Sequence, residues 1–170
     1  MFRFEPHTAS SLAWNQSADS LTSVCSPHVS GEALGKLESV DSLVVSHLGA
    51  VEQPDIVPEI ADLLIRLEGK TWSLATGQFA ERIYLSIRTT NPRADAGSLM
   101  RRLIGRRGKG GGHGRTAGGW IDASKISLED RPRFQRELAA RLARELKKNP
   151  EKMSPISLLP APAANGNHRP

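Results

Sequence analysis

Apolar residues between positions 42 and 69 follow two spacings, one typical of strands and one of helices. Residues 42–48 are β-branched and apolar and predict a buried strand, with His47 at its end. Pro54 suits the first turn of a helix because its missing N–H would have no partner there, and Gly69 marks the end of that helix. Between them apolar residues recur every three or four positions: Ile56, Val57, Ile60, Leu63, Leu64 and Leu67. We interpret this apolar stripe as core and His47 as structural.

Residues 71–76 and 82–88 both alternate between apolar and polar side chains, with a short turn predicted around residues 77–81. This pattern predicts a β-hairpin. In the second strand one face carries Ile83, Leu85 and Ile87, and the other carries Arg82, Tyr84, Ser86 and Arg88. Arg88 stands where this strand ends, a common place for ligands to meet a sheet. The alternative for Arg88 is an exposed cation at a sheet edge.

Two more helices and one more strand follow. Asp95 is placed to cap a helix that ends at Gly105, with Leu99, Leu103 and Ile104 facing inward and Arg101 and Arg102 outward. Residues 118–123 predict a strand, and Asp130 and Pro132 open a last helix that Pro150 terminates. The apolar stripe of that helix has i, i+4 spacing: Phe134, Leu138, Leu142 and Leu146.

The predicted order is strand, helix, strand, strand, helix, strand, helix. This order indicates an α/β fold, a small mixed sheet with helices packed on it. We assign residues 39–149 to one substrate-binding domain. Residues 1–38 are Ser-rich and predict a linker or disordered segment, with helix near residues 31–38, and residues 150–170 predict a disordered tail.

A glycine-rich stretch at residues 108–119 is the strongest candidate for function, since seven of its twelve residues are glycine. Backbone without Cβ atoms lets a ligand approach closely, and successive N–H groups form a concavity that favours anions. Lys109, His113 and Arg115 add side-chain donors. We interpret the stretch as a phosphate-gripping loop. A flexible linker is the alternative, which the flanking folded sequence disfavours.

Charge and composition point to a polyanionic partner. The chain of 170 residues carries a net charge of +5, and residues 96–121 contain no acid while holding Arg101, Arg102, Arg106, Arg107, Lys109 and Arg115. Cys25 is the one cysteine, which excludes an intrachain disulfide and a thiolate-cluster metal site. The sequence has no membrane-length apolar run, and its first residues lack the features of a signal peptide. We therefore expect a soluble cytoplasmic protein with no membrane partner.

Several catalytic motifs are tested and rejected. Gly112, Gly114 and Ala117 fit a loose dinucleotide-binding fingerprint, but a strand is predicted after them where that motif needs a helix. No Walker loop is present. Ser86, His113 and Asp122 have no spacing that supports a hydrolase triad.

Three features in order resemble one family: Ser86-Ile87-Arg88 at a strand end, the helix from Asp95, and Gly110-Gly111-Gly112-His113 followed by Ala117-Gly118. Together they are similar to the C-terminal DHH-associated (DHHA) domain of the DHH phosphoesterases, over about residues 40–123. That superfamily includes nano-RNA and cyclic-dinucleotide-product phosphodiesterases, oligoribonucleases, RecJ-type exonucleases and exopolyphosphatase-related proteins.

The resemblance implies a lobe that binds a short oligonucleotide or nucleotide phosphate. Arg88 would hold a phosphate, with Ser86 beside it, and His113 would donate to a phosphate oxygen. Gly110, Gly111 and Gly112 would admit the ligand to the backbone, with Lys109 and Arg115 nearby.

The chain lacks the Asp-His-His motif that, in a full-length relative, helps to hold two manganese ions. We therefore expect it to bind without cutting, with no cofactor of its own, either as a truncated form or as a lobe acting with a separate catalytic DHH domain. The alternative function is a stand-alone RNA-binding or interaction module that uses the arginines of residues 101–107.

Overall fold

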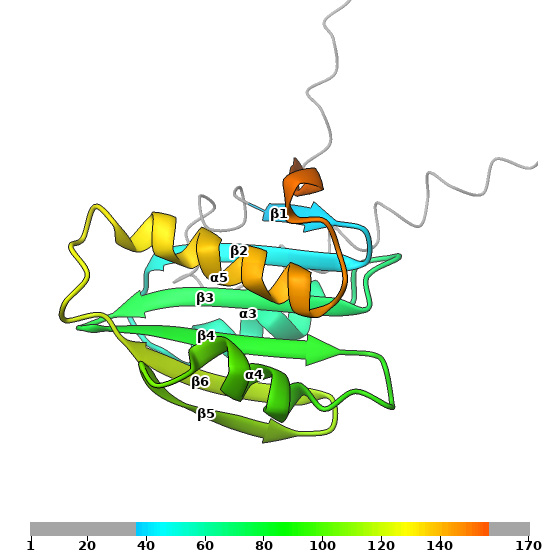
Figure 1. The fold of residues 1–170 in the computed structure, drawn as a ribbon, viewed down its shortest axis with the longest axis horizontal. Coiled ribbons are helices and arrows are strands. Elements are labelled where there is room, and N and C mark those ends of the chain that lie inside the picture. Colours follow the sequence, from blue (N-terminus) through cyan, green and yellow to red (C-terminus); the bar gives the residue numbers. More distant parts are fainter. Residues whose placement is uncertain (1–36, 157–170) are drawn as a thin grey trace, which may run out of the picture.

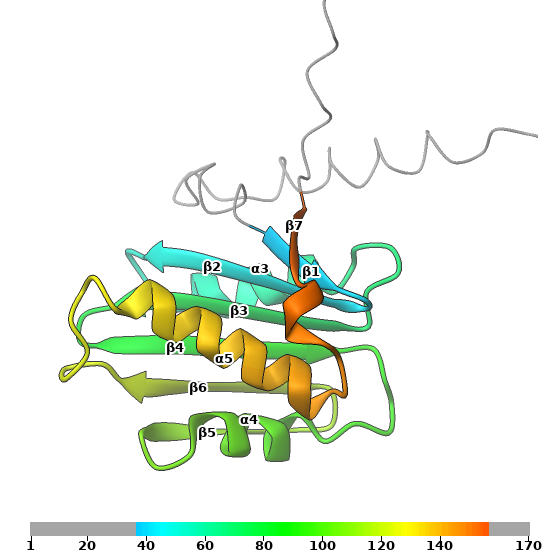
Figure 2. The same cartoon turned by 45° about the horizontal axis from the view of Figure 1, so that its top comes forward.

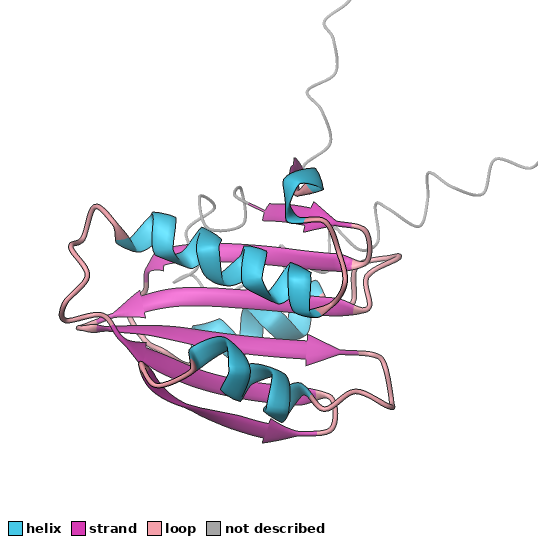
Figure 3. Cartoon of the chain, in the orientation of Figure 1, coloured by secondary structure: helices cyan, strands magenta, loops and turns pink. Residues whose placement is uncertain are grey.

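The computed structural model describes residues 37–156 as one seven-stranded sheet with three α-helices packed on it (Figures 1 and 3). Most of the predicted linker and part of the predicted tail lie outside these residues. The strands are β1 (Leu37–Val40), β2 (Leu43–Ala50), β3 (Trp72–Phe79), β4 (Arg82–Thr89), β5 (Gly108–His113), β6 (Thr116–Asp122) and β7 (Ser154–Ile156). The helices are α3 (Ile56–Leu64), α4 (Ala96–Ile104), α5 (Arg131–Glu145) and a 3₁₀ turn, η1 (Pro150–Lys152). The predicted mixed α/β class is confirmed.

The strands lie in the order β5-β6-β4-β3-β2-β1-β7. β2 and β3 are parallel and joined through α3, since parallel strands need a crossover, and the other neighbours are antiparallel. The predicted β3–β4 hairpin is confirmed, but its turn is at Ala80–Glu81 and not at 77–81. Gly77 lies inside β3, at a place where α3 packs so closely that a side chain does not fit. A Cβ there would lie 2.7 Å from Val57 Cγ2.

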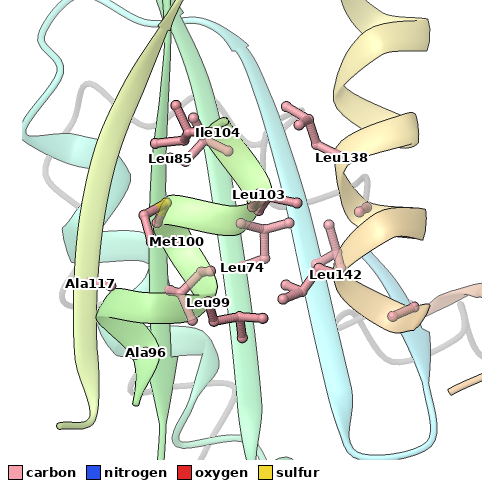
Figure 4. Packing of buried hydrophobic residues seen from close by; sticks show 14 of the residues in the cluster. Leu74, Leu85, Ala96, Leu99, Met100, Leu103, Ile104, Ala117, Leu138 and Leu142 are labelled. Atoms are coloured by element: carbon pink, nitrogen blue, oxygen red, sulfur yellow. The ribbon is translucent and has the colours of Figure 1, made fainter. Parts of the chain in front are cut away.

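Helices cover the sheet unevenly. Figure 2 shows α4 and α5 on one face, with α3 on the other. α5 and α4 bury the larger core cluster, in which Leu103, Leu142 and Leu74 meet between helices and sheet (Figure 4). α3 buries a second cluster over β2 and β3, with Ile60 and Leu64 against Val44 and Ala75. As a result, β5 and β6 have a helix on one face only.

The helix boundaries follow local hydrogen bonding. Asp95 caps α4 by accepting from the Ser98 amide at 2.9 Å, and Gly105 ends the helix with φ 62°, as predicted. α3 is shorter than predicted, because it ends at Leu64 and the residues up to Gly69 form turns. In these turns the Leu67 amide donates to the Leu64 carbonyl at 3.2 Å. α5 ends before Pro150 because Lys147 adopts a φ of 58° and turns the chain away.

Both ends of the described chain join the sheet, which the sequence did not indicate. β1 includes the last two residues of the stretch 31–38 where helix was predicted, and the rest of that stretch lies outside the described residues. β7 lies within the predicted tail. The two strands pair with each other, with Leu37 opposite Ile156. Leu37 is fully buried, so these strands contribute to the core.

The glycine-rich stretch is not a loop. It forms the antiparallel hairpin of β5 and β6, whose turn holds Gly114 and Arg115. The Gly114 and Arg115 carbonyls accept from the amides of Ala96 and Thr89 at 2.9 and 3.0 Å. The prediction failed because glycine is rare inside strands, and here the glycines serve the packing of α4 described below.

His47 has the structural environment predicted for it, but it lies within β2, which continues to Ala50, and not at the end of the strand. Its Nδ1 is 2.7 Å from Thr76 Oγ1, which also accepts from Gln135 at 3.0 Å. Its Nε2 is buried with no hydrogen-bond partner among the described residues. Burial, reinforced by the charge of Arg136, lowers the pKa of His47 from 6.5 to about 4.

Candidate functional site

The open face of the sheet is formed by β4, β6 and β5 on the side where α3 packs. Residues opposite each other in an antiparallel ladder point to the same side, so the register assigns each side chain to a face. Three rows cross this open face: Arg88–Thr116–His113, Ser86–Gly118–Gly111 and Tyr84–Trp120–Lys109. The side chains predicted to share one face of β4 therefore continue across two further strands.

A cavity of about 390 Å³ lies between this face and the start of α3. Four predicted site residues line it: Ser86, Arg88, Gly112 and His113. The remaining lining residues are Pro54, Asp55, Val57, Pro58, Tyr84, Leu85, Thr116, Ala117, Gly118 and Gly119. Arg88 and His113, 25 positions apart in the sequence, thus line the same cavity.

Arg88 is held rigidly by protein acceptors and has a side chain that is only 14% exposed. Its Nε and Nη2 donate to the two oxygens of Asp62 at 2.6 and 3.2 Å. Its Nη1 donates to Ser86 Oγ at 2.7 Å and lies 3.1 and 3.4 Å from the carbonyls of Ile87 and Ala117. Five N–H groups are available on a guanidinium, so one Nη2–H has no acceptor among the described residues. Ser86 acts by orienting Arg88.

Several glycines of the hairpin are required by close packing, either against α4 or between β5 and β6. A Cβ on Gly110 would lie 2.4 Å from Ile104 Cδ1, and one on Gly119 would lie 2.7 Å from the Lys109 carbonyl oxygen. On the helix side, a Cβ on Gly97 would overlap the Gly112 carbonyl oxygen at 2.1 Å. Gly112 also has φ 156°, a conformation that suits glycine. These glycines have a packing role that is sufficient to explain them.

Gly111 and Gly118 have no such packing role. They face each other in the β5–β6 ladder, on the open face. A Cβ on Gly118 would meet only the Leu85 carbonyl oxygen, at 3.8 Å, and one on Gly111 only Arg101 Nη1, at 3.9 Å. Both distances are ordinary contacts that an alanine would tolerate. This pair therefore leaves bare backbone at a place where the protein itself has room for side chains.

The other predicted site residues lie apart from the cavity. Gly110 faces α4, and Gly111 lies beside the cavity without lining it. Lys109 is exposed at the far end of the open face, opposite Trp120, and Arg115 is exposed in the β5–β6 turn. The single phosphate-binding loop predicted from the sequence is thus replaced by a sheet face with residues at different distances from Arg88.

Two contributions to the site were missed by sequence reasoning. Asp62 lies on the polar side of α3, and nothing in its spacing indicates that it pairs with a residue 26 positions away. Gly118 could have been found, since strand alternation places it on the face opposite Ala117. Asp55 also lines the cavity. The carboxylates of Asp55 and Asp62 together reduce the positive potential around Arg88.

Within residues 37–156 no group of three or more His, Cys, Asp or Glu side chains could hold a metal ion, so these residues do not fit the paired manganese site that the resemblance implies. In the same span, the helices are too short or too polar to cross a membrane.

Comparison with known proteins identifies relatives of the sequence. A family model described as the DHHA1 domain matches residues 41–144. An uncharacterized protein of Methanocaldococcus jannaschii is 29% identical over 87 residues, which is 51% of this chain and 16% of that protein. The chain therefore spans about a sixth of the length of that curated relative.

Three solved structures match at low sequence identity and with TM-scores below 0.5. The C-Ala domain of Aquifex aeolicus alanyl-tRNA synthetase has a TM-score of 0.44 and 20% identity, covering 61% of this chain and 98% of that domain. A pGpG-specific phosphodiesterase from Vibrio cholerae has a TM-score of 0.44 and 16% identity, covering 78% of this chain and 41% of the enzyme. An exopolyphosphatase-related protein from Bacteroides fragilis has a TM-score of 0.41 and 16% identity, covering 81% and 37%.

Proposed function

Because the chain belongs to the DHHA1 domain family, we propose that its cavity binds a phosphate of a nucleotide or short oligonucleotide. In this proposal Arg88 supplies the main charge, through its remaining Nη2–H and by exchange of Asp62 for the ligand. His113, exposed in the same cross-strand row and lining the same cavity, donates a second hydrogen bond. Charge-assisted hydrogen bonds from these two residue types suit phosphate oxygens.

The observation that carries this proposal is the bare pair Gly111–Gly118. The pair lies in the row next to Arg88, Thr116 and His113, where the protein has space for two methyl groups and carries none. The absence of side chains at Gly111 and Gly118 is explained if a ligand approaches the backbone of the open face. A backbone surface flanked by an arginine and a histidine fits a phosphate and the sugar attached to it.

We propose further that hydrolysis, in which this lobe takes part, is performed by a catalytic DHH domain. Phosphodiester cleavage by two metal ions needs several carboxylate and histidine ligands close together. In this scheme the lobe holds the end of a substrate away from the bond that is cut, as an exonuclease or oligoribonuclease of this superfamily would require. Manganese would then belong to the partner domain.

Isothermal titration calorimetry with 5′-phosphorylated dinucleotides to pentanucleotides tests the proposed site. Replacing Arg88 with Ala removes charge-assisted contacts and is expected to weaken binding roughly tenfold or more. His113→Ala should weaken binding by a smaller factor, because His113 is exposed. Arg133, exposed on α5 beside Glu137, supplies the matched control Arg133→Ala. Equal affinities for the parent and the Arg88/His113 double variant would show that the assigned cavity is wrong.

The alternative RNA-binding surface at residues 101–107 has less support in the structure. Arg102 pairs with Glu145 at 2.9 Å, and the Arg107 guanidinium lies 5.3 Å from the centre of the Phe134 ring. These contacts engage part of the basic stretch within the protein. Binding that strengthens with RNA length and is unaffected by Arg88→Ala would favour the alternative.

A further inference from the structure

A second cavity, of about 430 Å³, lies at the opposite end of the open face from Arg88. Tyr84 lines both cavities and therefore separates them along β4. The residues around the second cavity are Phe79, Ala80, Glu81, Arg82, Tyr84, Trp120, Asp122 and Ser124. Apart from Tyr84, none of the residues that line the Arg88 cavity lines this one.

A flat cation is stacked on an aromatic ring at this cavity. The Arg82 guanidinium lies 4.1 Å from the centroid of the Trp120 ring. Arg82 is exposed, so the guanidinium face turned away from the indole is accessible. Tyr84 is fixed beside it by an edge contact with Phe79, with ring centroids 6.4 Å apart and planes at 64°. The arrangement offers a planar, positively charged surface whose orientation is set before a ligand arrives.

The charges of the second cavity suit a nucleobase better than a phosphate. Glu81 and Asp122 line it, and carboxylates repel phosphate oxygens. Hydrogen bonds from Ser124, together with Lys125 and Arg82, hold the pKa of Asp122 below its ordinary value, so the group is ionised at neutral pH. An ionised carboxylate accepts hydrogen bonds from the ring and exocyclic N–H groups that bases present at their edges. Bases also stack on guanidinium planes and aromatic rings.

We propose that Arg82, stacked on Trp120, is the base-binding platform of a single-stranded oligonucleotide whose phosphate occupies the Arg88 cavity. This inference rests on the proposed function, because the Arg88 cavity fixes the other end of the strand. Duplex is disfavoured as the ligand because its bases are already stacked and paired. The carboxylates of Glu81 and Asp122 read the N–H groups of the bound base.

The distance between the two sites predicts a length requirement. Arg88 lies six positions after Arg82 in β4, which is about 20 Å along an extended strand. A mononucleotide occupies one site at a time, whereas a strand of several nucleotides engages both. Arg82 should therefore contribute to the binding of an oligonucleotide and not to the binding of a mononucleotide.

Calorimetric titration of the full chain with three ligands tests this platform. The ligands are a 5′-phosphorylated tetranucleotide, its fully abasic analogue and a nucleoside 5′-monophosphate. Arg82→Lys keeps the positive charge and removes the planar guanidinium. Arg133→Lys is the matched control on α5. The parent should bind the tetranucleotide about fivefold or more tightly than the abasic analogue. Arg82→Lys should abolish that difference while leaving monophosphate binding unchanged.

The outcomes separate this inference from the proposed phosphate site. If Arg82→Lys binds the tetranucleotide as tightly as the parent does while Arg88→Ala binds it more weakly, the platform is wrong and the Arg88 site stands. If Arg82→Lys loses affinity while Arg88→Ala does not, the phosphate site is wrong and the platform stands. A parent chain that binds none of the three ligands overturns both.

Discussion

The guanidinium of Arg88 and the carboxylate of Asp62 form a two-point ion pair, with Nε–Oδ1 at 2.6 Å and Nη2–Oδ2 at 3.2 Å. Arg88 is largely buried, whereas the Asp62 side chain is 53% exposed. The protein therefore places its own anion on the group that we assign to a phosphate. Asp62 orients the guanidinium and also competes with an incoming ligand.

This competition predicts that removal of the Asp62 charge tightens phosphate binding. Asp62→Asn keeps the shape of the side chain and should raise affinity about twofold to fivefold, the range expected for an exposed ion pair. Calorimetry with a 5′-phosphorylated dinucleotide measures the effect, and Glu59→Gln, also on α3 and exposed, is the matched control. Weaker binding by Asp62→Asn would mean that the pair positions Arg88 more than it blocks it.

The salt dependence of oligonucleotide binding should reveal the loss of one phosphate contact in Arg88→Ala. For single strands, log K falls with log salt at a slope of about −0.7 for each phosphate contacted. The slope of the Arg88→Ala variant should therefore be shallower by about 0.7 than that of the parent. Affinities measured between 50 and 200 mM salt, about the range over which such slopes are resolved, give the comparison. Identical slopes would place the phosphate elsewhere.

Two adjacent glycines of β6 should respond differently to alanine. Gly118→Ala places a methyl group on the open face, where the protein has room, so stability should stay level or rise by about 0.4–1 kcal/mol. Oligonucleotide binding should nevertheless weaken, because the methyl group stands where the ligand approaches. Gly119→Ala places its methyl group against β5 and should destabilise the fold by about 1–3 kcal/mol.

Urea unfolding gives the stability of each glycine variant, and calorimetry gives its affinity. The expected signature is a stable Gly118→Ala variant that binds poorly. Unchanged affinity in that variant would remove the bare Gly111–Gly118 pair as support for a ligand site.

His47 predicts a loss of stability in acid. Its pKa is about 4 in the folded chain and 6.5 as an unperturbed group, so between these values the unfolded state binds the extra proton. Stability is therefore highest above pH 6.5 and falls as the pH drops toward 4, by roughly 2 kcal/mol between pH 7 and 4.5.

Comparison with His47→Gln isolates this contribution, because Gln keeps a polar group for Thr76 and does not titrate. The difference in unfolding free energy between parent and variant should shrink by roughly 2 kcal/mol from pH 7 to 4.5. A difference independent of pH would show that His47 does not titrate as its burial implies.

The sequence was informative where periodicity and packing agree. The alternating residues of β4 and the capped, amphipathic α4 were predicted correctly, because Ile83, Leu85 and Ile87 on one side and Leu99 and Leu103 on the other meet in the same core. The face that carries Ser86 and Arg88 followed from the same alternation. The DHHA1 match likewise confirms the resemblance drawn from the glycines, His113 and Arg88.

What the sequence could not give depends on contacts between distant segments. A glycine run has two physical interpretations, a free loop and a strand packed tightly under a helix, and long-range contacts such as Gly97 against Gly112 distinguish them. The pairing of β1 with β7 joins segments more than 100 residues apart, without any local signal. The Arg88–Asp62 pair also joins distant segments, so the charges around the cavity could not be predicted from the sequence.

An amide-resolved NMR titration locates the bound phosphate residue by residue. A ¹⁵N-labelled chain would be titrated with a 5′-phosphorylated dinucleotide at low salt. If the phosphate binds at the Arg88 cavity, the largest shifts should occur at Ser86, Arg88, Gly111, His113 and Gly118. Shifts confined to residues 101–107, with the open face unchanged, would contradict it.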